Sequence, residues 1–279
     1  MPRPYDIMRV SSYGSPLKAQ RSFGAFRFAI YSHEDKTWRR QYMSSLVNAW
    51  RQFLNSRKFA RVGKHCSLKG RFLEVDGHVE IGDYCRIRNN VILRTNGGGK
   101  IILDTYSGLS YNCYLEARTI IKIGRFSGLA EFTIVRDTNH TIIGTTDHWR
   151  LTPYISLPIV VGESCMIGSN CYICPGVAIG DGAVVAQHSV VTKDVGPLEI
   201  WAGNPARKVG HRVNGISESM RSKYHDLLAQ QGLRENRHGF QKELNAVVDT
   251  AMQGINRAAQ ERDDLLPLFQ RESVETGES

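Results

Sequence analysis

The chain has 279 residues and a net charge of +9, and 41% of its residues are hydrophobic. That length and apolar content are sufficient to bury one large core. The sequence contains no run of 18 or more apolar residues, and its first residues lack the apolar stretch of a secretory signal. The composition therefore argues against a membrane span and predicts a cytoplasmic protein.

The positive charge is concentrated in residues 1–61, which hold 12 Lys and Arg against three Asp and Glu. These basic residues are scattered and form no nucleic-acid-binding motif, so we expect no binding to nucleic acid. One interpretation is peripheral association with an anionic membrane; the other is a solvated face or a contact with the acidic C-terminal segment. Residues 34–58 have the periodicity of a helix with one apolar stripe.

A repeat of six residues organises the chain from residue 62 to residue 212. This period fits neither an amphipathic helix nor an alternating strand. It fits a triangular coil in which each group of six forms one flat side and one corner, with an aliphatic residue pointing inward at position one. The clearest series of inward residues is Val161, Ile167, Ile173, Ile179, Val185 and Val191.

The cysteines support this register, because five of the six fall at position five, where other repeats have small residues. We expect these thiols to pack as small apolar groups. Cys171 and Cys174 have the C-x-x-C spacing of redox and metal sites. Ile173 between them is an inward residue of the repeat, which favours packing, and we expect no metal.

The repeat is interrupted at residues 94–101, which are glycine-rich, and at residues 136–158, which predict a loop extruded from the coil. After residue 195 the pattern is lost. Residues 213–279 are polar with helical spacing and predict two helices separated near residues 232–239. The predicted division is a basic, partly helical segment (1–61), a coil (62–212) and a helical extension (213–279).

Four blocks resemble the hexapeptide-repeat acyltransferases, especially the galactoside, maltose, streptogramin and polysaccharide O-acetyltransferases. The blocks are PIVVGESCMIGSN at 158–170, CPGVAIGDGAVVA at 174–186, SVVTKDV at 189–195 and AGNPAR at 202–207. The resemblance extends over about residues 62–212. It implies an all-β core, a left-handed parallel β-helix with N-terminal and C-terminal helical extensions, and a homotrimer with its active sites between neighbouring coils.

The Asp-Thr-Asn-His sequence at 137–140 resembles the catalytic motif of that family, which implies that His140 is the general base. A histidine titrates near neutral pH and can take the proton of an attacking hydroxyl. Without the motif, a lone histidine would more often be structural. Many family members have Trp where this chain has Met166. The candidate acceptor-binding residues are Asn139, Asp137, His148, Trp149 and Met166; Asp137 has a second possible role, orienting the imidazole.

The resemblance also implies acetyl-coenzyme A as the acyl donor. Lys193 and Arg207 suit its phosphates, because charge-assisted hydrogen bonds are strong. Ser169, Ala186 and Thr192 would line the pantetheine arm, and Asn204 would form part of the wall of the coenzyme site.

We therefore expect transfer of an acetyl or other short acyl group from acyl-coenzyme A to a sugar hydroxyl, in surface polysaccharide or lipid-linked glycan biosynthesis. The alternatives are N-acyl transfer to an amino sugar and a non-catalytic binding or scaffold role for the coil. A zinc-dependent carbonic anhydrase on the same scaffold would require three converging histidines. His140, His148 and His188 do not show that pattern, and His188 is expected at a surface corner.

Overall fold

The computed structural model describes residues 36–142, 144, 146–213, 246–247 and 249–270. Residues 43–279 form one compact unit and residues 1–42 another, of which only the start of a helix is described. None of the described helices is long and apolar enough to cross a membrane.

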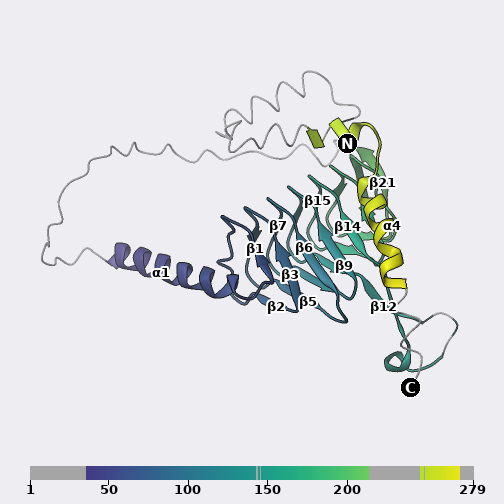
Figure 1. Ribbon diagram of the computed structural model, residues 1–279. Helices are drawn as coiled ribbons and strands as arrows, with labels where there is room; N and C mark the ends of the chain where they lie inside the picture. Colours follow the sequence, from purple (N-terminus) through teal and green to yellow (C-terminus); the bar gives the residue numbers. More distant parts are fainter. Residues whose placement is uncertain (1–35, 143, 145, 214–245, 248, 271–279) are drawn as a thin grey trace, which may run out of the picture. The chain divides into compact units, whose positions relative to one another are not determined.

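The repeat folds into the expected left-handed parallel β-helix, whose successive coils each add a short strand to three sheets (Figure 1). Sheet A contains β1 (Arg61–Val62), β3 (His78–Ile81), β6 (Lys100–Leu103), β9 (Ile120–Ile123), β14 (Ile159–Val161) and β17 (Ala178–Ile179). Sheet B contains β4 (Arg86–Ile87), β7 (Gly108–Leu109), β10 (Gly128–Leu129), β15 (Met166–Ile167), β18 (Val184–Val185), β20 (Glu199–Gly203) and β21 (Ala206–His211). Sheet C contains β2 (Glu74–Asp76), β5 (Ile92–Thr95), β8 (Tyr114–Ala117), β11 (Ile134–Arg136), β16 (Tyr172–Ile173) and β19 (Val190–Val191).

The strand register confirms the inward series. Val135 pairs with Ile173, and Ile173 pairs with Val191, so residues one coil apart stack directly on each other. All six inward residues from Val161 to Val191 are at most 1% exposed. The hydrophobic core therefore runs continuously through the coils, and each coil buries its apolar side only against its neighbours.

The corners are built at position four of the repeat, where the backbone enters the left-handed region. His188 is one such residue, with a φ of 59°, and it is exposed, as expected for a surface corner. At one series of corners the side chains stack in a ladder, with ring centroids 4.7–5.3 Å apart. The ladder consists of His65, Tyr84, Tyr106 and Phe126.

Four cysteines at position five are buried in the core, as the register predicts. Burial raises the pKa of the Cys113 thiol to about 11 and that of the Cys165 thiol to about 12. Thiols with such high pKa values are poor nucleophiles and poor metal ligands. Among the described residues, no group of three or more His, Cys, Asp or Glu side chains is arranged to hold a metal ion.

The extruded loop is partly ordered as a two-stranded antiparallel ribbon. β12 (Thr138–His140) pairs with β13 (Tyr154–Ser156), and a short 3₁₀ helix, η1 (Trp149–Leu151), lies between them. The loop leaves the coil after β11 of sheet C and returns to β14 of sheet A. It therefore projects from the corner between these two sheets, as β12 shows in Figure 1.

The helix expected at residues 34–58 is α1 (Lys36–Ser56). Its later turns contact the first coil through polar side chains. The Asn55 side chain donates to the carbonyls of Leu68 (2.7 Å) and Gly70 (3.0 Å), and that of Gln52 donates to the carbonyl of Cys66 (2.9 Å). The helix thus satisfies backbone acceptors at the open end of the β-helix.

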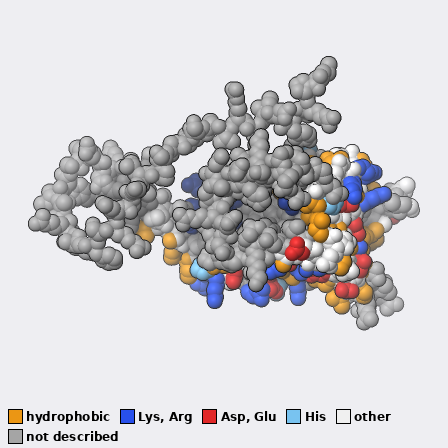
Figure 2. Space-filling model, turned by 90° about the horizontal axis from the view of Figure 1, so that it is seen from above, with side chains coloured by type: hydrophobic (Ala, Val, Ile, Leu, Met, Phe, Trp, Pro, Cys, Tyr) orange, Lys and Arg blue, Asp and Glu red, His pale blue; other side chains and the backbone are white. Residues whose placement is uncertain are grey.

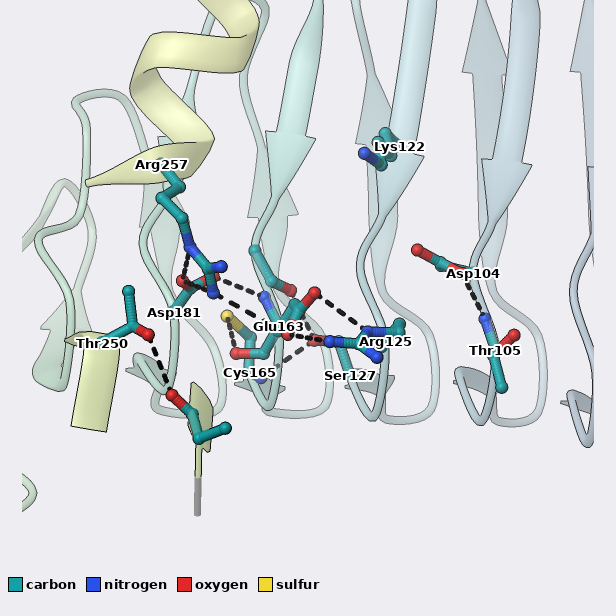
Figure 3. Close-up of polar contacts among 12 residues, drawn as sticks. Asp104, Thr105, Lys122, Arg125, Ser127, Glu163, Cys165, Asp181, Thr250 and Arg257 are labelled. Atoms are coloured by element: carbon teal, nitrogen blue, oxygen red, sulfur yellow. Dashed lines mark hydrogen bonds and ion pairs between the residues drawn. The ribbon is translucent and has the colours of Figure 1, made fainter. Parts of the chain in front are cut away.

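Much of the predicted C-terminal extension lies outside the described residues, but its last helix, α4 (Arg257–Gln270), packs across sheet A on β14 and β17. Ala258 is buried against Val160 and Ala178. The Arg257 guanidinium reaches down to the buried Asp181 carboxylate, at 2.6 and 2.8 Å (Figure 3). A buried carboxylate requires such a partner, and the pair holds α4 on the coil.

Along one edge of the surface in Figure 2, basic side chains alternate with acidic and hydrophobic ones. Charged side chains of the coil also form pairs between neighbouring coils. Arg94 bonds Glu74 one coil away, and Arg125 bonds Glu163.

Candidate functional site

The root of the extruded loop is fixed by Asp137. Its side chain is fully buried, and its carboxylate accepts hydrogen bonds from the backbone N–H groups of Arg118 (2.9 and 3.0 Å) and Thr119 (2.6 Å) and from the Thr119 hydroxyl (2.6 Å). Burial raises the pKa of this carboxyl, against the effect of these donors. We expect Asp137 to hold the loop on the coil, rather than to contact the acceptor or the imidazole.

His140 ends β12 and is half-buried, with its Nδ1 atom 3.3 Å from both the carbonyl oxygen and the hydroxyl oxygen of Thr152. A carbonyl can only accept a hydrogen bond. The Thr152 hydroxyl has a single proton and donates it to the carbonyl of Trp149 (2.8 Å), so it too faces Nδ1 as an acceptor. These partners assign the imidazole proton to Nδ1, which leaves the lone pair of Nε2 available as a base.

Two aromatic rings of the loop border the imidazole. The centroid of the Tyr154 ring lies 4.3 Å from that of the imidazole. The Trp149 ring meets the imidazole edge-on, with the two centroids 5.4 Å apart. The guanidinium of Arg118, a residue of the coil, lies over the Tyr154 ring, 3.8 Å from its centroid. Trp149 nevertheless remains more than half exposed. The loop therefore presents an aromatic surface next to a base, which suits the C–H face of a sugar.

The remaining loop candidates lie at the surface. Asn139 is exposed on β12. His148 is exposed and caps η1, where its Nδ1 atom accepts from the N–H of Arg150 (3.2 Å), and its ring stacks on Trp149 at 5.7 Å. The loop brings His140, His148 and Trp149 together, with Asn139 beside them in the sequence.

The candidates for the pantetheine arm line up along the corner between sheets B and C. Ser169 follows β15, and Ala186 follows β18 one coil further on. The N–H of His188 donates to the Ser169 carbonyl, and the N–H of Ala186 donates to the carbonyl of Trp201 in β20. These backbone bonds connect three successive layers in one row, which an extended ligand can follow.

The hairpin of β20 and β21 ends this row and carries Asn204 and Arg207, which are both exposed. The Glu199 carboxylate secures the hairpin through Lys208 (2.6 Å), the Trp201 indole N–H (2.7 Å) and the N–H of Gly196 (2.8 Å). Burial opposes ionisation of Glu199, but these donors prevail and lower its pKa.

Thr192 and Lys193 are exposed at a different corner, between sheets C and A, two coil layers beyond the root of the extruded loop. Asp194 beside them accepts from Arg262 of α4 (2.6 and 2.7 Å). Met166 is exposed on the outer surface of sheet B. A single chain thus distributes the candidates over two corners and one face, and it does not bring Met166 to the loop.

Thr152 and Arg118 contribute to the site, although the sequence did not indicate them. Neither lies in a recognisable motif. Thr152 contacts His140 and Arg118 contacts Tyr154, and both contacts depend on the pairing of β12 with β13. The pairing of His140 with Tyr154 is the feature that places Thr152 beside the imidazole. Thr152 lies within the interruption of the repeat, whereas Arg118 lies on the coil, far from it in the sequence, and has no sequence signal.

Comparisons with known proteins agree with this architecture. Residues 158–193 match the model of the bacterial transferase hexapeptide family (six repeats). Over 108 residues the chain is 40% identical to a probable macrolide acetyltransferase of Lysinibacillus sphaericus, covering 33% of this chain and 60% of the relative. Over 165 residues it is 28% identical to the putative colanic acid biosynthesis acetyltransferase WcaF of Escherichia coli (strain K12), covering 59% and 76%.

Among solved structures, AntD, an N-acyltransferase from Bacillus cereus in complex with dTDP and 3-hydroxybutyryl-CoA, has a TM-score of 0.50 and 23% sequence identity. The superposition covers 64% of this chain and 95% of AntD. At this level of identity the similarity concerns the fold. The match to the macrolide relative spans less than two thirds of that protein's length.

Proposed function

We propose that the protein transfers an acetyl group from acetyl-coenzyme A to a hydroxyl of a sugar, on the premise that its coil is similar to those of the hexapeptide-repeat transferases. The main support for the proposal is the position and surroundings of His140. This residue stands at the root of the extruded loop, its Nδ1 atom faces two acceptors of Thr152, and aromatic rings border it.

In the proposed reaction the acceptor oxygen attacks the thioester carbonyl carbon. Nε2 of His140 takes the hydroxyl proton as the new C–O bond forms. When the C–S bond breaks, the proton passes from the imidazole to the departing thiolate, so the enzyme returns to its starting state without a covalent intermediate. Thr152 accepts from Nδ1 throughout and stabilises the imidazolium that forms between the two transfers.

The acceptor is proposed as a glycan of surface polysaccharide or lipid-linked oligosaccharide biosynthesis. The curated relatives include an enzyme of that kind, the putative colanic acid acetyltransferase. An amino sugar is the second candidate, because a solved structure with the same fold is an N-acyltransferase. The same base would serve either acceptor, so the choice depends on what the loop and Met166 bind.

We further propose that the site is completed by a second copy of the chain in a homotrimer. Within one chain, His140 lies at the corner of sheets C and A, whereas the row of Ser169, Ala186 and Asn204 lies at the corner of sheets B and C. A single bound acyl-coenzyme A would have to contact that row with its pantetheine arm and place its thioester beside His140. Side-by-side packing of coils can oppose the first corner of one copy to the second corner of the next.

The direct test is an acetyl-transfer assay with acetyl-coenzyme A against free sugars, nucleotide sugars, amino sugars and lipid-linked glycans. We expect an ester product on a sugar hydroxyl. A product acetylated only on nitrogen would support the second candidate. Failure to acetylate any acceptor, together with no measurable binding of coenzyme A, would support a non-catalytic coil.

A further inference from the structure

The helix α1 is oriented with its polar face toward the coil and its apolar face outward. Gln52 and Asn55 bond the backbone of the first coil, on one side of the helix. The opposite side holds six large apolar residues at i, i+3 and i+4 spacing, each between 44% and 63% exposed. We call this set the α1 apolar face; it consists of Met43, Leu46, Val47, Trp50, Phe53 and Leu54.

This orientation is the reverse of that of an ordinary surface helix, whose apolar stripe faces the core. Among the described residues, no part of the chain packs over this apolar stripe, so the stripe does not serve to bury apolar surface within the fold. Contiguous exposed apolar surface of this kind marks a site of interaction. Its aromatic members, Trp50 and Phe53, have ring centroids 6.0 Å apart and are suited to the boundary between lipid headgroups and acyl chains.

The charge around the stripe favours one type of partner. Residues 36–61 contain seven Lys and Arg and no Asp or Glu. The Arg57 guanidinium lies 5.6 Å from the Phe53 ring, so a cation borders the apolar face directly. A helix with a Trp- and Leu-bearing face and only basic charges is the pattern of an interfacial, membrane-surface helix. Packing α1 against α1 of another copy would instead bring like charges together.

We propose that the α1 apolar face docks the protein onto an anionic lipid bilayer, with the helix in the plane of the headgroups. The apolar side chains enter the boundary region while the basic residues contact lipid phosphates. This inference stands independently of the acyl-transfer reaction. If both hold, the enzyme works at a surface where lipid-linked acceptors are present.

The test is co-sedimentation of the full chain with vesicles of phosphatidylcholine, with and without phosphatidylglycerol. We expect binding only to the anionic vesicles, weakened by added salt because screening reduces the attraction. Replacing Trp50→Ser and Phe53→Ser together should lower the partition coefficient by about tenfold or more. The single variant Arg57→Gln should lower the partition coefficient by roughly a few-fold, because it removes one basic charge that attracts the anionic lipids.

The matched control is Phe132→Ser, which removes an aromatic ring of similar exposure from a corner of the coil. It should bind vesicles as the wild type does. Circular dichroism should show unchanged folding of the α1 variants, because the replaced side chains are exposed. Equal binding of wild type and the Trp50/Phe53 variant would overturn the proposal. So would a change of oligomeric state in that variant by light scattering, since the face would then be an interface between copies.

Discussion

At the scale of single residues, the chemistry rests on the imidazole of His140. Replacing His140→Ala should reduce kcat by about 10²–10⁴-fold, which is the usual effect of losing a general base. The affinity for coenzyme A should be nearly unchanged, because the coenzyme is proposed to bind a row of residues at another corner of the coil and Lys193, two coil layers away from the loop. Steady-state kinetics and calorimetric titration with coenzyme A measure the two effects separately. Wild-type turnover of the variant at low substrate concentration would rule out this mechanism.

The tautomer of His140 gives a second prediction at this scale. Thr152→Val removes the hydroxyl acceptor at Nδ1 and the bond to the Trp149 carbonyl, but it keeps the Thr152 carbonyl and nearly the same volume. One neutral hydrogen bond contributes about 0.5–1.5 kcal/mol, so we expect kcat to fall by roughly 2- to 13-fold. The ¹⁵N spectrum of His140 should show the proton on Nδ1 in the wild type. A proton on Nε2 would contradict the assigned roles.

At the scale of elements, Glu199 connects the β20–β21 hairpin to the coil. Glu199→Gln should lower the free energy of unfolding by about 1–3 kcal/mol, because it removes charge-assisted bonds to Lys208 and Trp201. It should also raise KM for acetyl-coenzyme A if the hairpin forms part of the coenzyme site, with kcat much less affected. Denaturant melts and kinetics check the two expectations.

The pH dependence of this effect has a definite sign. The pKa of Glu199 is lower in the folded protein than its ordinary value, so ionised Glu199 stabilises the fold above the unfolded pKa. This contribution is lost as the pH falls through the folded pKa, below about pH 4.3. The stability difference between wild type and Glu199→Gln should therefore shrink in acid. A difference that grew below this pH would show that the carboxylate is not stabilised in the fold.

At the scale of the whole molecule, the separation of the candidates over different corners predicts complementation between copies. His140→Ala and Arg207→Ala chains should each be poorly active alone when assayed well below KM for acetyl-coenzyme A. Mixed trimers should regain activity, because in roughly one third of their interfaces an intact His140 would meet an intact Arg207 from the neighbour.

Light scattering should show a trimer for both variants, and co-expression with two different affinity tags isolates the mixed species. Mixed trimers that remain as inactive as the parents would place the complete site within one chain. A stable, fully active monomer would remove the basis for the trimer altogether.

The sequence by itself determined the coil. A six-residue period leaves one arrangement in which every Ile and Val of the Val161–Val191 series is buried, and the positions of the cysteines and of His188 follow from the same register. The sequence also located His140 at the interruption of the repeat. These features are local or periodic, so residue spacing encodes them directly.

Tertiary structure decided the relations between residues far apart in the chain. Thr152 reaches His140 only because β12 pairs with β13, and Asp137 is drawn into the coil by backbone N–H groups 18 and 19 residues earlier. The outward orientation of the apolar stripe of α1 is also a tertiary outcome. Periodicity reveals that a helix has two faces, but only the hydrogen bonds of Gln52 and Asn55 to the first coil determine which face lies inside.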